Sequence, residues 1–332
     1  MEAARREAEA FYARYGEPLT LRGLFYILVS RGVIPNTVSA YKRLSEALAR
    51  ARCAGEFPWH LLKDTTRRRE YKEPLTRYPT SPLTPEELAR ALEEYVRSRT
   101  EVSVNPWEDQ PHRVVVVVEK EALGDLVSRF IDEAWGRGVY QVRVIRGYDS
   151  ATDLHELARD LSLIPAHQRP VVLILGDFDP SGEDIARDFR ERLTMLSNRK
   201  DIVFEKVAVT LDQILEMRLP AKPESLEELE KMRRDPRYRA YVERLAREAE
   251  RDERVRRLVE MYGSPEIRVE LDALAALRPE EFKRILAGAI AKYFDEGIYE
   301  RVTKPREERL RRLAEEVRRE SLESVRRMLG GG

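Results

Sequence analysis

Three acidic side chains follow apolar segments of the chain, and their chemistry suits a hard divalent cation. Glu119 directly follows a run of five valines, and Asp177 and Asp179 follow the run Val-Val-Leu-Ile-Leu. The two-residue spacing puts both aspartates on one side of an extended segment and turns Phe178 away, toward apolar packing. Carboxylates gathered at one place repel one another unless a cation lies among them, and oxygen ligands favour Mg²⁺, with Mn²⁺ as an alternative. We therefore predict a metal site at Glu119, Asp177 and Asp179.

A parallel sheet is expected to position these acids. Between residues 113 and 210, apolar runs alternate with helical patterns, which is typical of a doubly wound α/β fold. Strands are expected at 113–118, 140–147, 170–177 and 203–209, and helices at 120–136, 151–162 and 182–196. Functional groups in such sheets gather at the carboxyl ends of the strands, where the strand order reverses. In the simpler interpretation Asp179 begins a capping turn and Glu119 is an exposed strand-end residue, but the two motifs together favour a site.

Residues 1–72 have the pattern of a winged-helix domain. Helices are expected at 2–15, from the N-cap Thr20 to Gly32, and from Asn36 or Thr37 to about Arg52. Segment 57–62 then resembles a strand and 64–72 a charged wing. The third helix of a winged helix commonly enters the major groove. The DNA-binding candidates on this helix and the wing are Lys42, Arg43, Arg50, Arg67, Arg68 and Arg69.

The distribution of charge agrees with such a division. Residues 1–72 carry a net charge of +6 and residues 113–210 a net charge of −3, although the whole chain is neutral. A basic module beside an acidic one suits a part that grips DNA joined to a part that holds metal.

The two acidic motifs resemble those of a known family. Val-Glu-Lys-Glu-Ala at 118–122 resembles the strand-end glutamate block of the Toprim domain, and Asp-Phe-Asp-Pro-Ser-Gly at 177–182 resembles its Asp-x-Asp-Pro-x-Gly block. The resemblance is narrower to the topoisomerase VI DNA-cleaving chain and its meiotic double-strand-break relatives, with single-domain "mini-A" proteins closest in type. It extends from about residue 18 to 210. It implies an α/β fold in which a winged-helix domain precedes a Rossmann-like Toprim domain, and a Mg²⁺-dependent homodimer that cuts both strands of DNA.

A tyrosine matches a second signature of that family, Arg-x-x-[Phe/Tyr]-Tyr. The segment from Arg22 to Tyr26 reads Arg-Gly-Leu-Phe-Tyr, with Gly23 where the family usually has an acidic residue. Arg22 and Tyr26 share a helix face. The resemblance implies that Tyr26 attacks a phosphodiester and forms a phosphotyrosyl bond, with Arg22, Glu119 and Lys120 completing the catalytic set. Tyr26 also lies in a strongly apolar stretch, so it could instead be a core aromatic residue with a satisfied hydroxyl group.

The remaining segments are expected to be helical. Residues 73–112 are a connector with a helix that begins near Thr84, where Glu87 completes a capping box. Residues 211–332 form a helical extension on the Toprim domain, and its apolar segment 269–294 is expected to pack on the core. Glu270 and Asp272 interrupt this segment. They could approach the metal site, although capping of a helix before Leu274 is the simpler interpretation.

Composition excludes several classes of protein. The single Cys53 among 332 residues excludes an intramolecular disulfide and a cysteine-based zinc site. No apolar run has membrane-spanning length, so a cytoplasmic, nucleoid-associated protein without membrane contact is expected. No ATP-binding motif is evident, and strand passage would need a separate GHKL-type ATPase. Two other functions stay open: a Toprim nuclease like those of plasmid-defence systems, which hydrolyses DNA without a covalent tyrosine, and a non-catalytic DNA-binding module.

Overall fold

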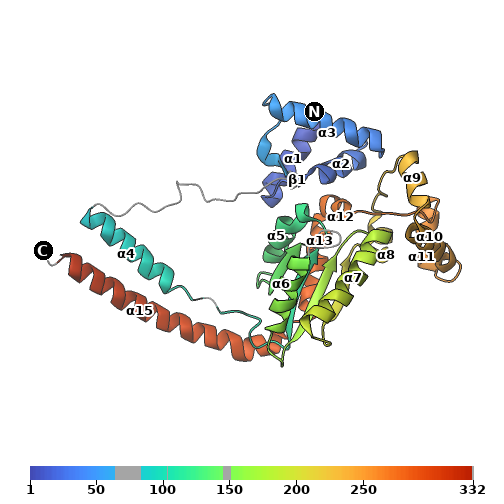
Figure 1. Ribbon diagram of the computed structural model, residues 1–332. Coiled ribbons are helices and arrows are strands. Elements are labelled where there is room, and N and C mark those ends of the chain that lie inside the picture. Colours follow the sequence, from blue (N-terminus) through green and yellow to red (C-terminus); the bar gives the residue numbers. More distant parts are fainter. Residues whose placement is uncertain (64–83, 103, 145–150, 331–332) are drawn as a thin grey trace. The chain divides into compact units, whose positions relative to one another are not determined.

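The chain has an α/β fold in which helices predominate and the strands are parallel (Figure 1). The computed structural model describes residues 1–63, 84–102, 104–144 and 151–330. They form two compact units. The first holds the N-terminal segment that begins at Met1 together with His112–Tyr293, and the second holds the segment that ends at Pro111 together with Phe294 and the residues after it. No helix in these ranges is both long and apolar enough to cross a membrane.

A four-stranded parallel sheet forms the centre of the first unit. Its strands are β3 (His112–Val118), β4 (Gln141–Val144), β5 (Arg169–Leu175) and β6 (Val203–Ala208), in the order β4-β3-β5-β6. The chain runs from β3 to β4 on one side and from β5 to β6 on the other, so the strand order reverses between β3 and β5. These two strands pair along their full length, from His112 opposite Arg169 to Val118 opposite Leu175. The parallel sheet expected from the alternating pattern is confirmed.

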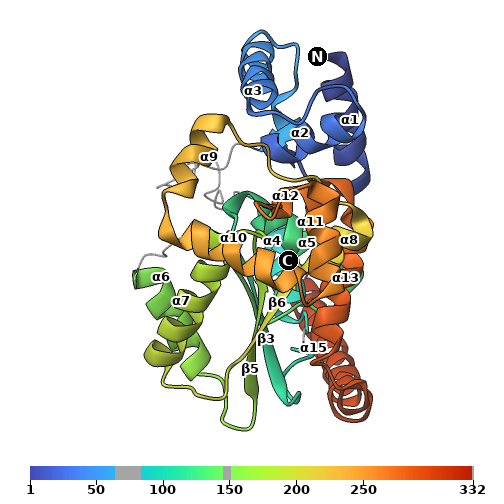
Figure 2. The same ribbon diagram turned by 90° about the vertical axis from the view of Figure 1, so that its right-hand side faces the viewer.

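Helices cover both faces of this sheet, which explains why its two central strands are apolar except at their first residues. The helices that alternate with the strands are η4 (Glu121–Leu123), α5 (Gly124–Ala134), α6 (Ala151–Ser162) and α7 (Pro180–Ser197). Val115 and Val117 of β3 join a buried cluster with α6 and α7 on one face. Figure 2 shows α5 and α13 (Pro279–Ala291) on the other side of the sheet. Because successive side chains of a strand point to opposite faces, a strand buried on both sides has no polar positions.

The chain begins with three helices, as predicted. They are α1 (Glu2–Tyr15), α2 (Leu21–Ser30) and α3 (Val38–Cys53). Thr20 caps α2 by accepting a hydrogen bond from the Gly23 amide, and Thr37, rather than Asn36, caps α3.

The strand expected at 57–62 is wrong for most of its length. Trp59–Leu61 forms the short helix η1, and only β2 (Leu62–Lys63) is extended; it pairs in parallel with β1 (Leu19–Thr20) instead of forming a hairpin. Pro58 leads directly into the η1 turn, whose tight helical geometry the apolar side chains alone do not reveal. The expected wing at 64–72 lies outside the described residues, so the winged helix stays a prediction.

Six helices follow the sheet in the first unit. They are α8 (Leu211–Met217), α9 (Leu226–Arg233), α10 (Pro236–Ala249), α11 (Glu253–Tyr262), α12 (Leu271–Leu277) and α13. The apolar helices α12 and α13 are buried in the core, as predicted. Helix α12 packs closely on α2, because a Cβ atom added at Gly23 would lie only 3.3 Å from that of Ala276. A side chain at this position would need Leu19, Thr20 or Ala276 to shift by a few tenths of an ångström.

The second unit is built from two long helices and a short helical turn. They are α4 (Pro85–Arg99), α15 (Lys304–Gly330), and α14 (Glu296–Ile298) with the π-helical segment η5 (Tyr299–Thr303). Helix α4 lies along α15 (Figure 1), and Arg318 donates a hydrogen bond to the Thr100 hydroxyl at 2.8 Å. The capping box of Thr84 and Glu87 is confirmed.

Candidate metal centre

The ends of β3 and β5 bring Glu119 and Asp177 into direct contact. The Glu119 amide donates to the Leu175 carbonyl at 2.9 Å, which continues the strand pairing by one residue. The Glu119 Oε2 atom in turn accepts a hydrogen bond from the Asp177 amide at 3.0 Å. Gly176 makes this possible, since a Cβ atom there would lie 2.6 Å from Oε2. The reversal of strand order therefore places a carboxylate against the backbone of the neighbouring strand end.

Asp179 makes two contacts, and the capping interpretation of this residue is confirmed. Its Oδ1 atom accepts a hydrogen bond from the Gly182 amide at 2.7 Å and caps α7. Its Oδ2 atom lies 3.2 Å from the Arg268 guanidinium. The side chain is buried, so both oxygens are held in place.

A segment ninety residues away completes the site. Phe178 and Val269 form an antiparallel bridge, with two N–H···O distances of 2.8 and 3.0 Å. Side chains alternate on each side of such a bridge, so Arg268 and Glu270 face the same way as Asp179 and Asp177. Phe178 points the other way and packs against buried aromatic and apolar side chains, as predicted.

Glu270 lies at the N-cap position of α12 but does not cap it, so the capping interpretation is wrong for this residue. Its Oε2 atom accepts a hydrogen bond from the Tyr26 hydroxyl at 2.7 Å and lies 3.0 Å from Nε of Arg22. Its Oε1 atom lies 3.3 Å from Lys120 and 3.4 Å from Lys222. Four donors therefore satisfy one buried carboxylate.

Lys120 joins the two halves of the cluster. Its ammonium nitrogen lies 2.8 Å from Asp272 and 3.2 Å from Asp177, in addition to its contact with Glu270. Burial disfavours the charged ammonium, but the three carboxylates outweigh burial and hold the pKa of Lys120 above its ordinary value. Lys120 is thus a fixed positive charge within the cluster.

The carboxylates differ in how well they are neutralised. Burial, then repulsion by Asp177, raises the pKa of Glu119 to about 7. Burial also raises the pKa of Asp177, against the opposing effect of Lys120. Burial alone would raise the pKa of Glu270 too, but its cationic neighbours hold it at about 2. Among the described residues no cation pairs with Glu119 as three do with Glu270, and a divalent cation would supply positive charge there.

The three predicted ligands suit a hard cation by chemistry, because all their donor atoms are carboxylate oxygens. Glu119 and Asp177 lie at the ends of the two central strands. Among the described residues no three His, Cys, Asp or Glu side chains surround one point as metal ligands. Lys120 and Arg268 hold Asp177 and Asp179, so a cation would compete with these two side chains.

Tyr26 lies in the cluster and in the core at once. It has no exposed surface and packs among residues of α2, α3 and α12, while its hydroxyl group donates to Glu270. Burial, then the Glu270 carboxylate, raises the pKa of Tyr26 far above its ordinary value. Arg22 shares its helix face, as expected, and binds the same oxygen of Glu270.

The structure separates the expected DNA-binding residues. Lys42, Arg43 and Arg50 are exposed on α3, and of these Lys42 lines a pocket together with Arg22. Arg67, Arg68 and Arg69 lie outside the described residues.

Two cationic residues of the site, Lys222 and Arg268, were not predicted from the sequence. The polar-apolar alternation at 268–270, ahead of an apolar helix, was the available signal for the second of them. No protein-family model, curated protein or solved structure matches the chain. The function therefore has to be argued from the site itself.

Proposed function

We propose that this protein is a divalent-cation-dependent enzyme that cleaves phosphodiester bonds of DNA. The observation that carries the proposal is the contact of the Glu119 carboxylate with the Asp177 amide at the reversal of strand order, with Asp179 two residues further along the chain. Glu119, Asp177 and Asp179 would hold Mg²⁺, or Mn²⁺ in its place. Bound there, the cation would stabilise the negative charge that develops on a phosphate under attack.

The chain's own cations would orient the substrate. Lys120 and Arg22 border the carboxylates and are held by Glu270, so their positions are fixed before a phosphate arrives. Preorganised donors of this kind stabilise a developing charge without having to rearrange during the reaction. Arginine in particular can bind two phosphate oxygens at once.

Hydrolysis is the reaction that the geometry supports best. The Tyr26 hydroxyl group is buried and donates a hydrogen bond to Glu270. Glu270 is a poor base because its pKa is about 2, whereas the pKa of Tyr26 is raised. Water has no such constraint, and it becomes a stronger nucleophile at a metal site. We therefore propose a Toprim-type nuclease first.

Transesterification by Tyr26 is the second candidate. It is favoured by one observation, the position of the phenol within the cluster itself, 2.7 Å from Glu270. The resemblance to the topoisomerase VI DNA-cleaving chain supports the same reaction, with a homodimer and a GHKL-type ATPase as proposed partners. This candidate requires Tyr26 to become exposed.

Cleavage of supercoiled plasmid DNA separates the candidates. Cutting by the wild type should require Mg²⁺ and should be lost in Asp177→Asn, while Asp188→Asn on the surface of α7 keeps it. Absence of cutting in the wild type would instead favour a DNA-binding module.

The Tyr26→Phe variant then decides the nucleophile. If the reaction is hydrolysis, Tyr26→Phe still cuts DNA, and no wild-type protein stays joined to the product. If the reaction is transesterification, Tyr26→Phe does not cut DNA, and the wild type forms a covalent protein–DNA adduct. Tyr15→Phe, which removes another buried phenol, controls for folding.

A further inference from the structure

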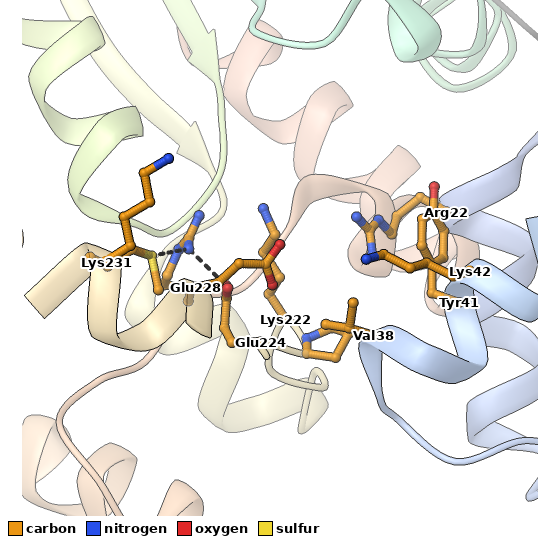
Figure 3. A pocket seen from close by; sticks show the side chains of 11 residues that line it. Arg22, Val38, Tyr41, Lys42, Lys222, Glu224, Glu228 and Lys231 are labelled. Atoms are coloured by element: carbon orange, nitrogen blue, oxygen red, sulfur yellow. Dashed lines mark hydrogen bonds and ion pairs between the residues drawn. The ribbon is translucent and has the colours of Figure 1, made fainter. Parts of the chain in front are cut away.

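A pocket of about 410 Å³ borders the carboxylate cluster, and most of its polar lining is cationic. One wall comes from α2 and α3, and the other from α9 and the segment before it. Figure 3 shows Lys231 on one wall, Arg22 and Lys42 on the opposite wall, and Lys222 between them. Arg268 is a fifth cation, whereas only two lining residues, Glu224 and Glu228, are acidic. The balance favours an anionic ligand.

Two of these cations form no ion pair across the described ranges. Lys42 and Lys231 are both exposed, and the charge of Lys42 helps to lower the pKa of Glu228 in the same pocket. Arg22 and Lys222, in contrast, are bound to Glu270. The pocket thus has two cations held by Glu270 and two exposed ammonium groups on opposite walls.

The rest of the lining suits the less polar part of a nucleotide. Val38, Pro223 and Met232 are apolar, and Tyr41 adds an aromatic ring with the Arg22 guanidinium 4.0 Å above it. Aromatic rings and arginine planes are the usual partners of unstacked bases. The volume falls within the range of pockets that hold single small molecules, about 300–1,000 Å³.

We propose that this pocket holds one unpaired nucleotide of the DNA strand that is cut, with its phosphate between Lys42 and Lys231. The inference rests on the proposed function, because Arg22 and Lys222 line the pocket and also bind Glu270 in the cluster. A strand whose phosphodiester lies at the carboxylates therefore continues into the pocket. The nucleotide is unpaired because a pocket of this size has no room for a complementary strand. Helix α9 thus forms one wall of a substrate site.

Binding of labelled oligonucleotides in EDTA tests the pocket without cleavage. The probes are a single strand, a blunt duplex of the same sequence, and free adenosine 5′-monophosphate. The variant is Lys42→Gln with Lys231→Gln, and the control is Lys200→Gln, an exposed lysine outside the pocket. Because both pocket lysines are exposed and without an ion pair in the described residues, the double variant should keep the wild-type melting temperature.

The double variant should bind the single strand roughly tenfold more weakly, whatever its sequence. Because one phosphate is no longer neutralised, the slope of log K against log salt concentration should also fall by about 0.7. The affinity of the double variant for the blunt duplex should equal that of the wild type, and the control variant should bind every probe as the wild type does. Equal losses for single strand and duplex, or no loss for either, would overturn the proposal. Tight binding of adenosine 5′-monophosphate that is lost in the double variant, with DNA binding intact, would also overturn it in favour of a free nucleotide.

Failure of the pocket and failure of the proposed function give different results. If the wild type cuts DNA with Mg²⁺ and the double variant has the same KM, the proposed nucleotide site is wrong and the proposed DNA-cleaving activity is supported. If the single strand binds through Lys42 and Lys231 but no DNA is cut, the nucleotide site is supported and the proposed activity is wrong.

Discussion

Glu119 and Glu270 are buried in one cluster, yet their pKa values are shifted in opposite directions. Glu270 faces Lys120, Lys222 and Arg22, whereas Glu119 faces the backbone amide of Asp177 and that residue's like charge. Burial acts on both alike, so the difference comes from the neighbours. One carboxylate therefore holds cations of the chain, and the other is the one that we propose for an ion from solution.

Stability of the Glu270→Gln variant should reveal this difference through its pH dependence. A pKa lowered from 4.5 to about 2 stabilises the fold by about 3 kcal/mol above pH 4.5. That contribution is lost as the pH falls from 4.5 toward 2, because the unfolded chain then takes up the proton first. The variant should thus be less stable than the wild type by roughly 3 kcal/mol near neutral pH and by about half that at pH 3.

Urea unfolding at pH 6.5 and pH 3 measures the difference. Glu250→Gln, which changes an exposed glutamate, provides the matched control and should show no change in the free energy of unfolding. The same deficit at both pH values in Glu270→Gln would show that the residue acts by packing rather than by charge.

Gly176→Ala should disturb Glu119 without touching any charge. The added methyl group would lie 2.6 Å from the Glu119 Oε2 atom, so the carboxylate has to leave the Asp177 amide. We expect Mg²⁺ affinity, measured by calorimetry, to fall by at least tenfold. Gly288→Ala is the control, because its Cβ atom meets nothing within 4 Å. Wild-type Mg²⁺ affinity in Gly176→Ala would remove Glu119 from the set of ligands.

Among the elements, the contact of α2 with α12 connects the N-terminal helices to the cluster. The Thr20 hydroxyl group accepts from the Gly23 amide at 2.8 Å and donates to Asp272 at 2.7 Å. One side chain therefore caps α2 and satisfies a buried carboxylate of α12. This dual role makes Thr20 more important than an ordinary N-cap residue.

Thr20→Val should lower the free energy of unfolding by about 2–4 kcal/mol. About 1 kcal/mol comes from the lost cap and the rest from the buried Asp272 oxygen left without its donor. Thr37→Val is the matched control, since Thr37 caps α3 through the Ala40 amide and contacts no buried acid; about 1 kcal/mol is expected there. If urea unfolding shows the same loss of unfolding free energy in Thr20→Val and Thr37→Val, the hydrogen bond from Thr20 to Asp272 contributes nothing to stability.

Local sequence patterns predicted most of the helices and strands, but they could not predict which distant segments pair with one another. The valine run, the caps Thr20, Thr84 and Asp179, and the helix periods act over a few residues, so they are visible in the sequence. The bridge of Phe178 with Val269 depends on two segments ninety residues apart, and no local pattern marks it. For the same reason the sequence favoured a capping role for Glu270, whose partners all lie in other elements.

At the scale of the whole molecule, the cluster joins four stretches of chain that are distant in sequence. Side chains of α2, the end of β3, the end of β5 and the segment before α12 meet within hydrogen-bonding distance. An ion held there would bind the folded state and not the unfolded chain, since the ligands are far apart once the sheet is lost. Ion binding and folding are therefore linked.

Mg²⁺ should raise the melting temperature of the wild type. At a concentration one hundred times the dissociation constant, the gain is about 2.7 kcal/mol, which corresponds to roughly 5 °C or more for a unit of this size. Differential scanning calorimetry with and without Mg²⁺ measures it, and Asp188→Asn should give the same rise as the wild type. Asp177→Asn should give none. A rise that persists in Asp177→Asn would place the stabilising ion elsewhere, because a ligand can stabilise the fold only through a site that unfolding destroys.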